Sequence, residues 1–277
     1  MTKHPKSLAN NKRLHELLEE KYHQFNTLTF IEDDPIQIPH QFTKLQDIEI
    51  AAFWTAMLAW GNRKSIINAA QKLMAWMDNA PHDFVLHHTQ KDLKPFLQFK
   101  HRTFNATDAL YFIEFFKQHY TAHHSLEDAF LWHTKNVKDK VSRHLTEWRL
   151  ENFHHYFFSL EEAPLRTRKH IATPERKSTC KRLNMFLRWM VRSDKHKVDF
   201  GLWHNIKPCD LLCPLDVHVE NVSRKLGLIQ RSQRDWQTVL ELTEVLKMFD
   251  PNDPVKYDFA LFGMGVSEKI NTRKFLK

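Results

Sequence analysis

Two segments in the second half of the chain carry the residue types best suited to bond-breaking chemistry. CPLDVHVENVSRKLGL, residues 213–228, contains Asp216, and CKRLNMFLRWMVR, residues 180–192, begins with Lys181 and Arg182. An ionised carboxylate stabilises positive charge that develops on a substrate, and a deprotonated amine attacks carbon to form a Schiff base. An acidic residue at the start of a helix also has an ordinary structural role, because the helix dipole favours it. Asp216 therefore has both a chemical and a structural interpretation.

The element that must position Asp216 is a helix predicted over residues 215–226. Its apolar residues are spaced to form one stripe facing a core, and Gly227 stands where a left-handed residue would end the helix. Asp216 falls in the first turn of this helix, away from the stripe. The stripe consists of Leu215, Val219, Val222 and Leu226.

A second helix, predicted over residues 181–193, must position Lys181. Its buried face consists of Leu183, Phe186, Leu187 and Met190, and its polar stripe of Lys181, Asn184, Arg188 and Arg192. The polar stripe is interpreted either as a solvated surface or as a face turned toward phosphates, which guanidinium groups bind in bidentate fashion. The preceding Lys177 and Ser178 would add a cation, a hydroxyl and free backbone N–H groups to a phosphate site.

Composition limits the classes of function. The chain has 277 residues, 41 Lys and Arg against 33 Asp and Glu, and a net charge of +8. This excess of basic residues favours polyanionic partners. Three cysteines are too few for a disulfide scaffold, the start MTKHPKSLANNK lacks the apolar core of a secretory signal, and no apolar run is long enough to cross a membrane. We therefore expect a cytoplasmic protein without a membrane partner.

The expected fold class is all-α. The chain has only 5 glycines, which leaves little material for β-hairpins or a phosphate-binding glycine loop, and long stretches show helical periodicity. The polar and basic segment 161–180 separates two helical regions and is the best candidate for a ligand-contacting loop. Helices are predicted over residues 8–25, 46–60, 64–78, 107–120, 125–132, 136–150, 181–193, 215–226, 235–248 and 255–264.

Three stretches, in order along the chain, resemble the helix-hairpin-helix DNA glycosylases, the superfamily of endonuclease III and the 8-oxoguanine glycosylases. PLDVHV followed by RKLGL resembles the segment that carries the family's catalytic aspartate, which makes Asp216 that residue. Residues 47–77 look like the family's early helix pair, with Trp60 to Arg63 in the turn, and residues 253–265 resemble its closing helix. Taken singly, these last two stretches are also explained as a helical hairpin and an amphipathic core helix.

The resemblance implies a two-lobed fold with a cleft between the lobes. The first lobe would comprise about 1–60 with 228–277, and the second about 61–227. The hairpin signature Pro-Gly-x-Gly and the iron–sulfur loop of endonuclease III are both absent from the sequence. The archaeal 8-oxoguanine glycosylases share the weakened hairpin and are the nearer branch. The whole chain is most similar to an uncharacterised bacterial family described as a domain of unknown function, which carries no activity.

By this resemblance, the protein is expected to be a base-excision DNA glycosylase, with or without abasic-site lyase activity, acting on a damaged base such as an oxidised purine. Its partner would be damaged duplex DNA, and we expect a monomer with no cofactor and no iron–sulfur cluster. The alternative is a non-catalytic DNA- or RNA-binding protein that keeps the glycosylase fold. The expected catalytic residues are Lys181 and Asp216; the DNA-binding residues Arg63, Lys64, Lys177, Ser178, Arg182, Arg188, Arg192 and His218; and the base-pocket residues Trp60, Phe186, Trp189 and Trp203.

The position of the catalytic lysine depends on the helix register. One register puts Lys181 there, and the other, which aligns Phe186 and Met190 better, puts Arg182 there. An arginine stays protonated near neutral pH and cannot form a Schiff base. We favour Lys181, because a shift of one residue rotates a helical side chain by only about 100°.

Other clusters are weaker candidates. His119 and His123 have the i, i+4 spacing of metal ligands, and several His-His pairs such as His154-His155 occur, but no carboxylate or cysteine completes a site. We interpret these histidines as solvated surface residues. The three cysteines, Cys180, Cys209 and Cys213, could bind zinc with a histidine, but small buried hydrophobic residues are the simpler interpretation. No metal is therefore expected.

Overall fold

The structure is a computed structural model that describes residues 11–131 and 144–267. These residues are mostly helical, and the strands among them are the antiparallel pair β1, Lys100–His101, and β2, Phe104–Asn105. The all-α prediction is confirmed. The short helices α3 and α6 were not predicted, and the predicted helix 136–150 lies partly outside the described residues. The α-helices are α2 Lys12–Phe25, α3 Leu28–Asp33, α4 Leu45–Leu58, α5 Arg63–Trp76, α6 Pro81–His87, α7 Ala106–Ala122, α8 Glu127–Leu131, α9 Leu145–Phe157, α10 Lys181–Val191, α11 Val217–Lys225, α12 Trp236–Lys247 and α13 Tyr257–Ser267.

The chain divides into two compact units. Unit 1 comprises Met1–Phe30 with Pro174–Lys277, and unit 2 comprises Ile31–Thr173. These bounds differ from the lobes expected from the sequence in two places: residues 174–227 belong with the two ends of the chain, and residues 31–60 belong with unit 2. The physical reason lies in α10, whose Arg188 pairs with Asp258 of α13 and whose Arg192 donates to the Tyr22 hydroxyl of α2.

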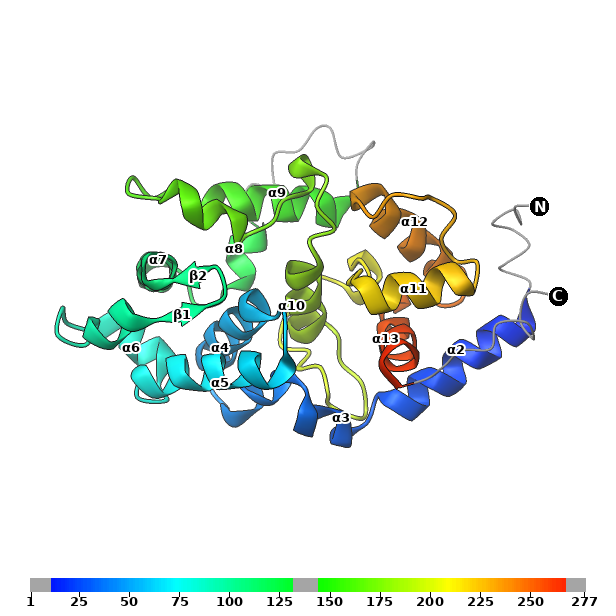
Figure 1. Ribbon diagram of the computed structural model, residues 1–277, viewed down its shortest axis with the longest axis horizontal. Helices are drawn as coiled ribbons and strands as arrows, with labels where there is room; N and C mark the ends of the chain where they lie inside the picture. The colour runs from blue at the N-terminus through cyan, green and yellow to red at the C-terminus, as the bar shows by residue number, and fades with distance from the viewer. Residues whose placement is uncertain (1–10, 132–143, 268–277) are drawn as a thin grey trace. The chain divides into compact units, whose positions relative to one another are not determined.

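Unit 1 is built around α13. Helices α2 and α11 both pack against it, and Figure 1 shows α2 in blue and α11 in yellow beside the red α13. The predicted stripe of α11 is confirmed, since Leu215, Val219, Val222 and Leu226 are all buried. Gly227 has a φ of 73°, so the predicted left-handed C-terminal residue is confirmed as well.

Unit 2 is organised around α4, which is buried from Ile48 to Leu58. A helix that is apolar on all sides must be enclosed, and α5, α6 and aromatic side chains of α7 and α9 enclose it. Phe53 of α4 contacts four phenylalanines of α7 and α9 at ring-centroid distances of 5.6–5.9 Å. The expected pair of helices with a polar turn is confirmed by α4 and α5, which lie side by side in Figure 1.

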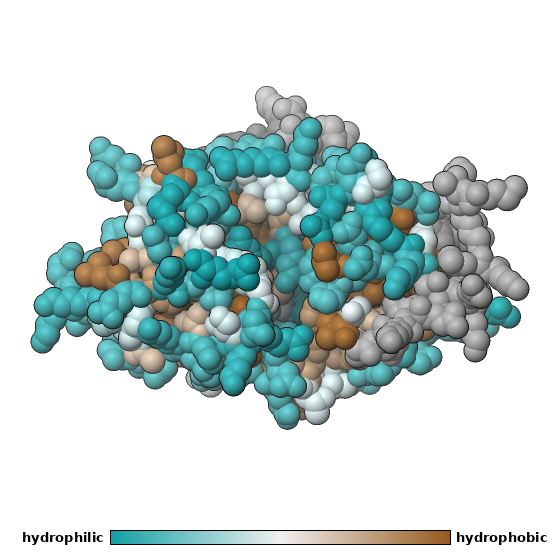
Figure 2. Space-filling view, viewed as in Figure 1, coloured by the Kyte–Doolittle hydropathy of each residue, from teal (hydrophilic) through white to brown (hydrophobic). Residues whose placement is uncertain are grey.

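Hydrophilic side chains cover most of the face seen in Figure 2, where brown apolar patches are small and scattered. Scattered exposed apolar side chains are normal for protein surfaces. Among residues 11–131 and 144–267, no helix combines the length and apolar character needed to cross a membrane. The large apolar side chains that are exposed are Leu28, Leu97, Leu165, Val217, Met248 and Val266.

Candidate active site

The start of α10 positions Lys181 as the first residue of that helix. Cys180 precedes it in a left-handed conformation, with a φ of 49°, and its backbone N–H donates to the Ser178 hydroxyl at 3.2 Å. Lys177 is also left-handed, and its carbonyl accepts from the backbone N–H of Trp236 at 3.1 Å. Left-handed conformations are unusual for residues other than glycine, so the contacts of this turn must stabilise it. The turn in this way fixes the position of the Lys181 backbone.

Asp216 is the N-cap of α11, and the helix itself begins at Val217. This corrects the expectation that Asp216 lies within the first turn. Its Oδ1 accepts from the backbone N–H groups of His218 at 2.9 Å and Val219 at 3.0 Å. The ordinary structural role of an acidic residue at a helix start is therefore present in full.

The other carboxylate oxygen of Asp216 faces Lys181. Its Oδ2 lies 4.0 Å from Lys181 Nζ, and the two side chains are 21% and 25% exposed. Capping fixes the carboxylate plane through Oδ1 and leaves Oδ2 directed at the amine. An amine and a carboxylate from two different helix starts thus share one partly solvated place, where a ligand can reach both.

Behind this pair lies a buried ionic network centred on α10. Arg188 donates to Asp199 from Nε at 3.2 Å and pairs closely with Asp258 of α13. Burial raises the pKa of Asp258 to about 6, and the negative charges of Asp216 and Asp199 act in the same direction, whereas Arg188 and Lys181 oppose the shift. Asp258 therefore exchanges its proton close to neutral pH.

Arg192 is enclosed by carboxylates. It contacts Asp194 at 2.6 Å, Asp253 at 2.9 Å and Asp199 at 3.1 Å, and only 1% of its side chain is exposed. The expectation that Arg188 and Arg192 face phosphates is therefore wrong. The helical periodicity was read correctly, but this flank of α10 turns inward, where the carboxylates of other elements neutralise both guanidinium groups.

The remaining cations expected at the site in unit 1 stay at or near the surface. Lys177 is exposed, Ser178 and Arg182 are partly exposed, and exposed His218 has its Nδ1 at 3.2 Å from the Gly265 carbonyl. Burial lowers the pKa of Arg182 to about 10, which still leaves its guanidinium charged at neutral pH. These positions can contact an anion, whereas Arg188 and Arg192 cannot.

Three of the four expected pocket aromatics belong to the core of unit 1. Phe186, Trp189 and Trp203 are at most 2% exposed, and the rings of Phe186 and Trp203 pack edge to face at 5.3 Å. As core residues, they do not line an open pocket, which corrects that expectation. Trp60 lies in unit 2 and is partly exposed, as is Arg63, while Lys64 is exposed.

Comparison with known families gives one match over most of the chain. Residues 34–267 match the family described as "Protein of unknown function (DUF2400)". The chain belongs to the DUF2400 family. Searches among curated proteins and among solved structures return no match. The family model spans Lys181, Asp216 and the buried ionic network, but its description assigns no activity to them.

In this DUF2400 protein, the residues that sequence reasoning missed are the carboxylates of the buried network. Asp258 lies in a stretch interpreted only as a closing helix, and Asp199 lies in a loop. The available signal was the position of Arg188 next to the apolar stripe of α10, since a buried guanidinium requires a carboxylate partner. Neither carboxylate is identifiable as that partner from spacing alone, because Asp199 lies beyond the end of α10 and Asp258 is 70 positions along the chain from Arg188.

Two histidines of the DUF2400 protein differ from expectation, whereas two of its three cysteines agree with it. His119 is buried, with its ring nitrogens 3.0 Å from the Tyr156 hydroxyl and 2.9 Å from the Ser125 carbonyl, and His154 is buried too. The prediction of solvated histidines is wrong at these two positions. Cys180 and Cys213 are buried thiols, as interpreted from the sequence, and Cys209 is partly exposed. Within the described ranges, no three His, Cys, Asp or Glu side chains converge as metal ligands.

Proposed function

We propose that this DUF2400 protein is a base-excision DNA glycosylase that acts on a damaged base in duplex DNA, with Lys181 and Asp216 as its catalytic residues. The observation that carries the proposal is the 4.0 Å approach of Lys181 Nζ to Asp216 Oδ2, between two partly exposed side chains. Both residues correspond to catalytic residues of the glycosylases that the sequence resembles, and they are 35 positions apart in the sequence. Their approach is what a shared reaction centre requires.

The proposed reaction begins with cleavage of the bond between C1′ of the sugar and the base nitrogen. The bonding electrons leave with the base, which takes up a proton, and positive charge develops on the sugar. The ionised carboxylate of Asp216 stabilises that charge. The amine of Lys181, once it has given a proton to the departing base, forms a bond to C1′. The sugar ring then opens as a second amine proton passes to the ring oxygen, which converts this adduct into a Schiff base. Attack by water instead of the amine would give a glycosylase without lyase activity.

The register at the start of α10 supports Lys181 over Arg182 as the nucleophile. Lys181 contacts Asp216, whereas Arg182 keeps a protonated guanidinium that cannot attack carbon. In this proposal, Arg182 and Lys177 bind the phosphates of the DNA strand, because both are cations near the same turn. The nucleophile and its phosphate contacts would then all come from the loop and helix start at residues 177–182, and Asp216 would come from the start of α11.

Borohydride trapping tests the proposal. The wild-type protein is incubated with a duplex that carries an abasic site or 8-oxoguanine, and reduction turns any Schiff base into a stable covalent adduct. Lys181→Ala should abolish the adduct, and Asp216→Asn should prevent adduct formation on 8-oxoguanine. Arg182→Ala should weaken DNA binding but still form the adduct. An adduct that survives Lys181→Ala would refute the role of Lys181.

A second candidate function is a DNA-binding protein without catalysis. The burial of Phe186, Trp189 and Trp203 favours it, because a flipped base needs an apolar or aromatic pocket and these three rings are already packed. This candidate predicts DNA binding with no adduct and no base release across a panel of lesions. The trapping experiment, combined with a binding measurement, separates the two functions.

A further inference from the structure

The turn between α4 and α5 in unit 2 contains a partly exposed tryptophan whose ring contacts two histidine rings. Trp60 directly follows the last turn of α4 and is partly exposed. Its indole stacks on the His170 ring, with a centroid distance of 5.7 Å and an interplanar angle of 27°, and meets the His101 ring edge to face at 5.3 Å. Two histidines from distant segments therefore set the orientation of one aromatic ring.

His101 fixes the backbone of this turn. It is buried, and its Nε2 lies 3.1 Å from the carbonyl of Leu58 at the end of α4. Burial lowers the pKa of His101, so its ring is neutral at pH 7 and can donate to that carbonyl. The Trp60 backbone N–H also donates to the Leu58 carbonyl, at 2.7 Å. The carbonyl thus ties both the tryptophan and its edge neighbour to α4.

His170 is fixed in turn by a buried carboxylate. It is 2% exposed, and its Nε2 lies 3.2 Å from Oδ2 of Asp108, which is fully buried. Burial alone would raise the pKa of Asp108, but contacts with His170, the Asn105 backbone N–H and the Thr167 hydroxyl lower it to about 2. Arg166 also pairs with this carboxylate. The ring beneath Trp60 therefore lies next to a carboxylate that is ionised at neutral pH.

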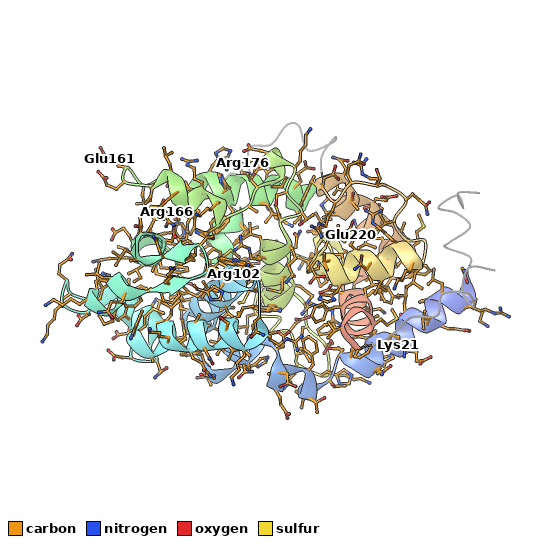
Figure 3. All side chains as sticks on the ribbon, in the orientation of Figure 1. Lys21, Arg102, Glu161, Arg166, Arg176 and Glu220 are labelled. Carbon is orange, nitrogen blue, oxygen red and sulfur yellow. The ribbon has the colours of Figure 1, made fainter. Side chains whose placement is uncertain are left out.

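Arg102 lies across the same turn. It occupies a left-handed position in the β1–β2 connection, with a φ of 54°, and is exposed. Gly61 has a φ of 105°, a conformation that favours glycine, and a Cβ added there would lie 2.5 Å from Nη1 of Arg102, so the guanidinium lies directly against this glycine. No carboxylate in the described part of the chain forms an ion pair with Arg102. Figure 3 labels Arg102 together with Arg166, the partner of the buried Asp108.

We propose that Trp60 is a stacking platform for an unpaired nucleobase, and that Arg102 binds the phosphate next to that base. An aromatic face accepts any base, and a neighbouring guanidinium binds the backbone phosphate in bidentate fashion. Because the two histidines hold the indole in place, little side-chain freedom is lost when a base stacks on it. The exposed cation Lys64 at the start of α5 adds to the positive charge of this surface.

This inference extends the proposed function by naming where unpaired DNA is bound, and it rests on DNA being the partner. It does not depend on catalysis, because every residue it uses lies in unit 2, whereas Lys181 and Asp216 lie in unit 1. A base in an intact duplex offers no free face to an indole. The ligand is therefore a strand with at least one base outside the helical stack.

The test uses the full-length chain and fluorescence anisotropy with two labelled single strands, an oligothymidine and an abasic strand of equal length and charge. Trp60→Ala should weaken binding of the oligothymidine about tenfold, the loss of roughly one stacked base, and should leave the abasic strand unchanged. Trp60→Phe should retain most of the preference for bases. Arg102→Ala should weaken both strands equally and reduce the salt dependence by about one phosphate contact.

Trp76→Ala is the matched control. Trp76 is also a partly exposed tryptophan of unit 2, but it packs on Lys72 and on Phe96 and Phe99 at the other end of α5. It should not change the preference for bases. If Trp60→Ala lowers the thermal midpoint, Trp60→Leu, which keeps apolar bulk without a π face, is compared with Trp60→Phe instead.

Equal losses on the two strands, or no loss on either, would overturn the platform. An identical effect of Trp76→Ala would overturn it as well. Failure of the proposed glycosylase would give a different result. The protein would form no adduct and release no base, but its preference for base-bearing strands would still depend on Trp60. Conversely, an active enzyme whose base preference ignores Trp60 would refute only the platform.

Discussion

We expect the fold to tolerate asparagine at position 216 and to be destabilised by alanine there. Its Oδ1 caps α11 through two backbone N–H groups, and asparagine offers an equivalent oxygen in the same position. Alanine offers none, and both N–H groups would then depend on water. The prediction is that Asp216→Asn leaves the free energy of unfolding nearly unchanged, whereas Asp216→Ala lowers it.

The expected magnitude follows from the two contacts of the carboxylate. Loss of an N-cap costs about 1 kcal/mol, within a range of roughly 0.5–2 kcal/mol. The ion pair with Lys181 is partly exposed and separated by 4.0 Å, so it contributes only about 0.2–1 kcal/mol. Its loss is offset in part, because the charge of Asp216 opposes ionisation of the buried Asp258. Asp216→Asn should therefore cost less than about 0.5 kcal/mol, by the same comparison of caps and exposed pairs.

Urea unfolding followed by far-UV circular dichroism measures both variants, and Asp216→Ser is a third variant that keeps a capping oxygen. Serine should rank with asparagine. Equal destabilisation by asparagine and alanine would refute the capping argument, since it would mean that the charge stabilises the fold and the helix cap does not. In that case, Asp216→Asn would no longer separate catalysis from folding.

Two further predictions concern the buried charges. Burial lowers the pKa of His119 to about 4, so His119 takes up a proton on unfolding at pH values below its ordinary pKa of about 6.5. The free energy of unfolding should therefore fall by roughly 3 kcal/mol as the pH drops from about 6.5 to 4. His119→Gln should reduce this pH dependence in urea unfolding measured at several pH values. Arg192→Ala should lower the free energy of unfolding by about 3–5 kcal/mol, because it removes the cation that Asp194 and Asp253 contact and leaves Asp199 with Arg188 alone. A loss of less than about 1 kcal/mol in Arg192→Ala, or a wild-type free energy of unfolding that does not change between about pH 6.5 and 4, would contradict these arguments.

Local patterns predicted the helices well because they depend on neighbours within one or two turns. The apolar stripes of α10 and α11 and the left-handed Gly227 follow from spacing alone. The approach of Lys181 to Asp216 could be expected only through resemblance to a known family, because spacing does not bring two helix starts together.

The sequence could not show which way the basic flank of α10 turns. Arg188 and Arg192 are equally well explained as a surface stripe, and carboxylates outside the helix make their burial favourable. These carboxylates are Asp194, Asp199, Asp253 and Asp258. The same holds for His119, whose partners Tyr156 and Ser125 come from other elements. Tertiary partners decide the burial of polar groups, and these partners are not encoded in a local period.

The rate of base release under single-turnover conditions tests the central claim most directly. Wild-type protein and Asp216→Asn are each mixed in excess with duplexes carrying one of a panel of damaged bases, and the free base is quantified over time while DNA affinity is measured in parallel. The account predicts release of at least one damaged base by the wild type and a loss of about a hundredfold or more in Asp216→Asn, at unchanged affinity. Equal rates for the two proteins, or bound DNA with no base released from any duplex, would contradict it.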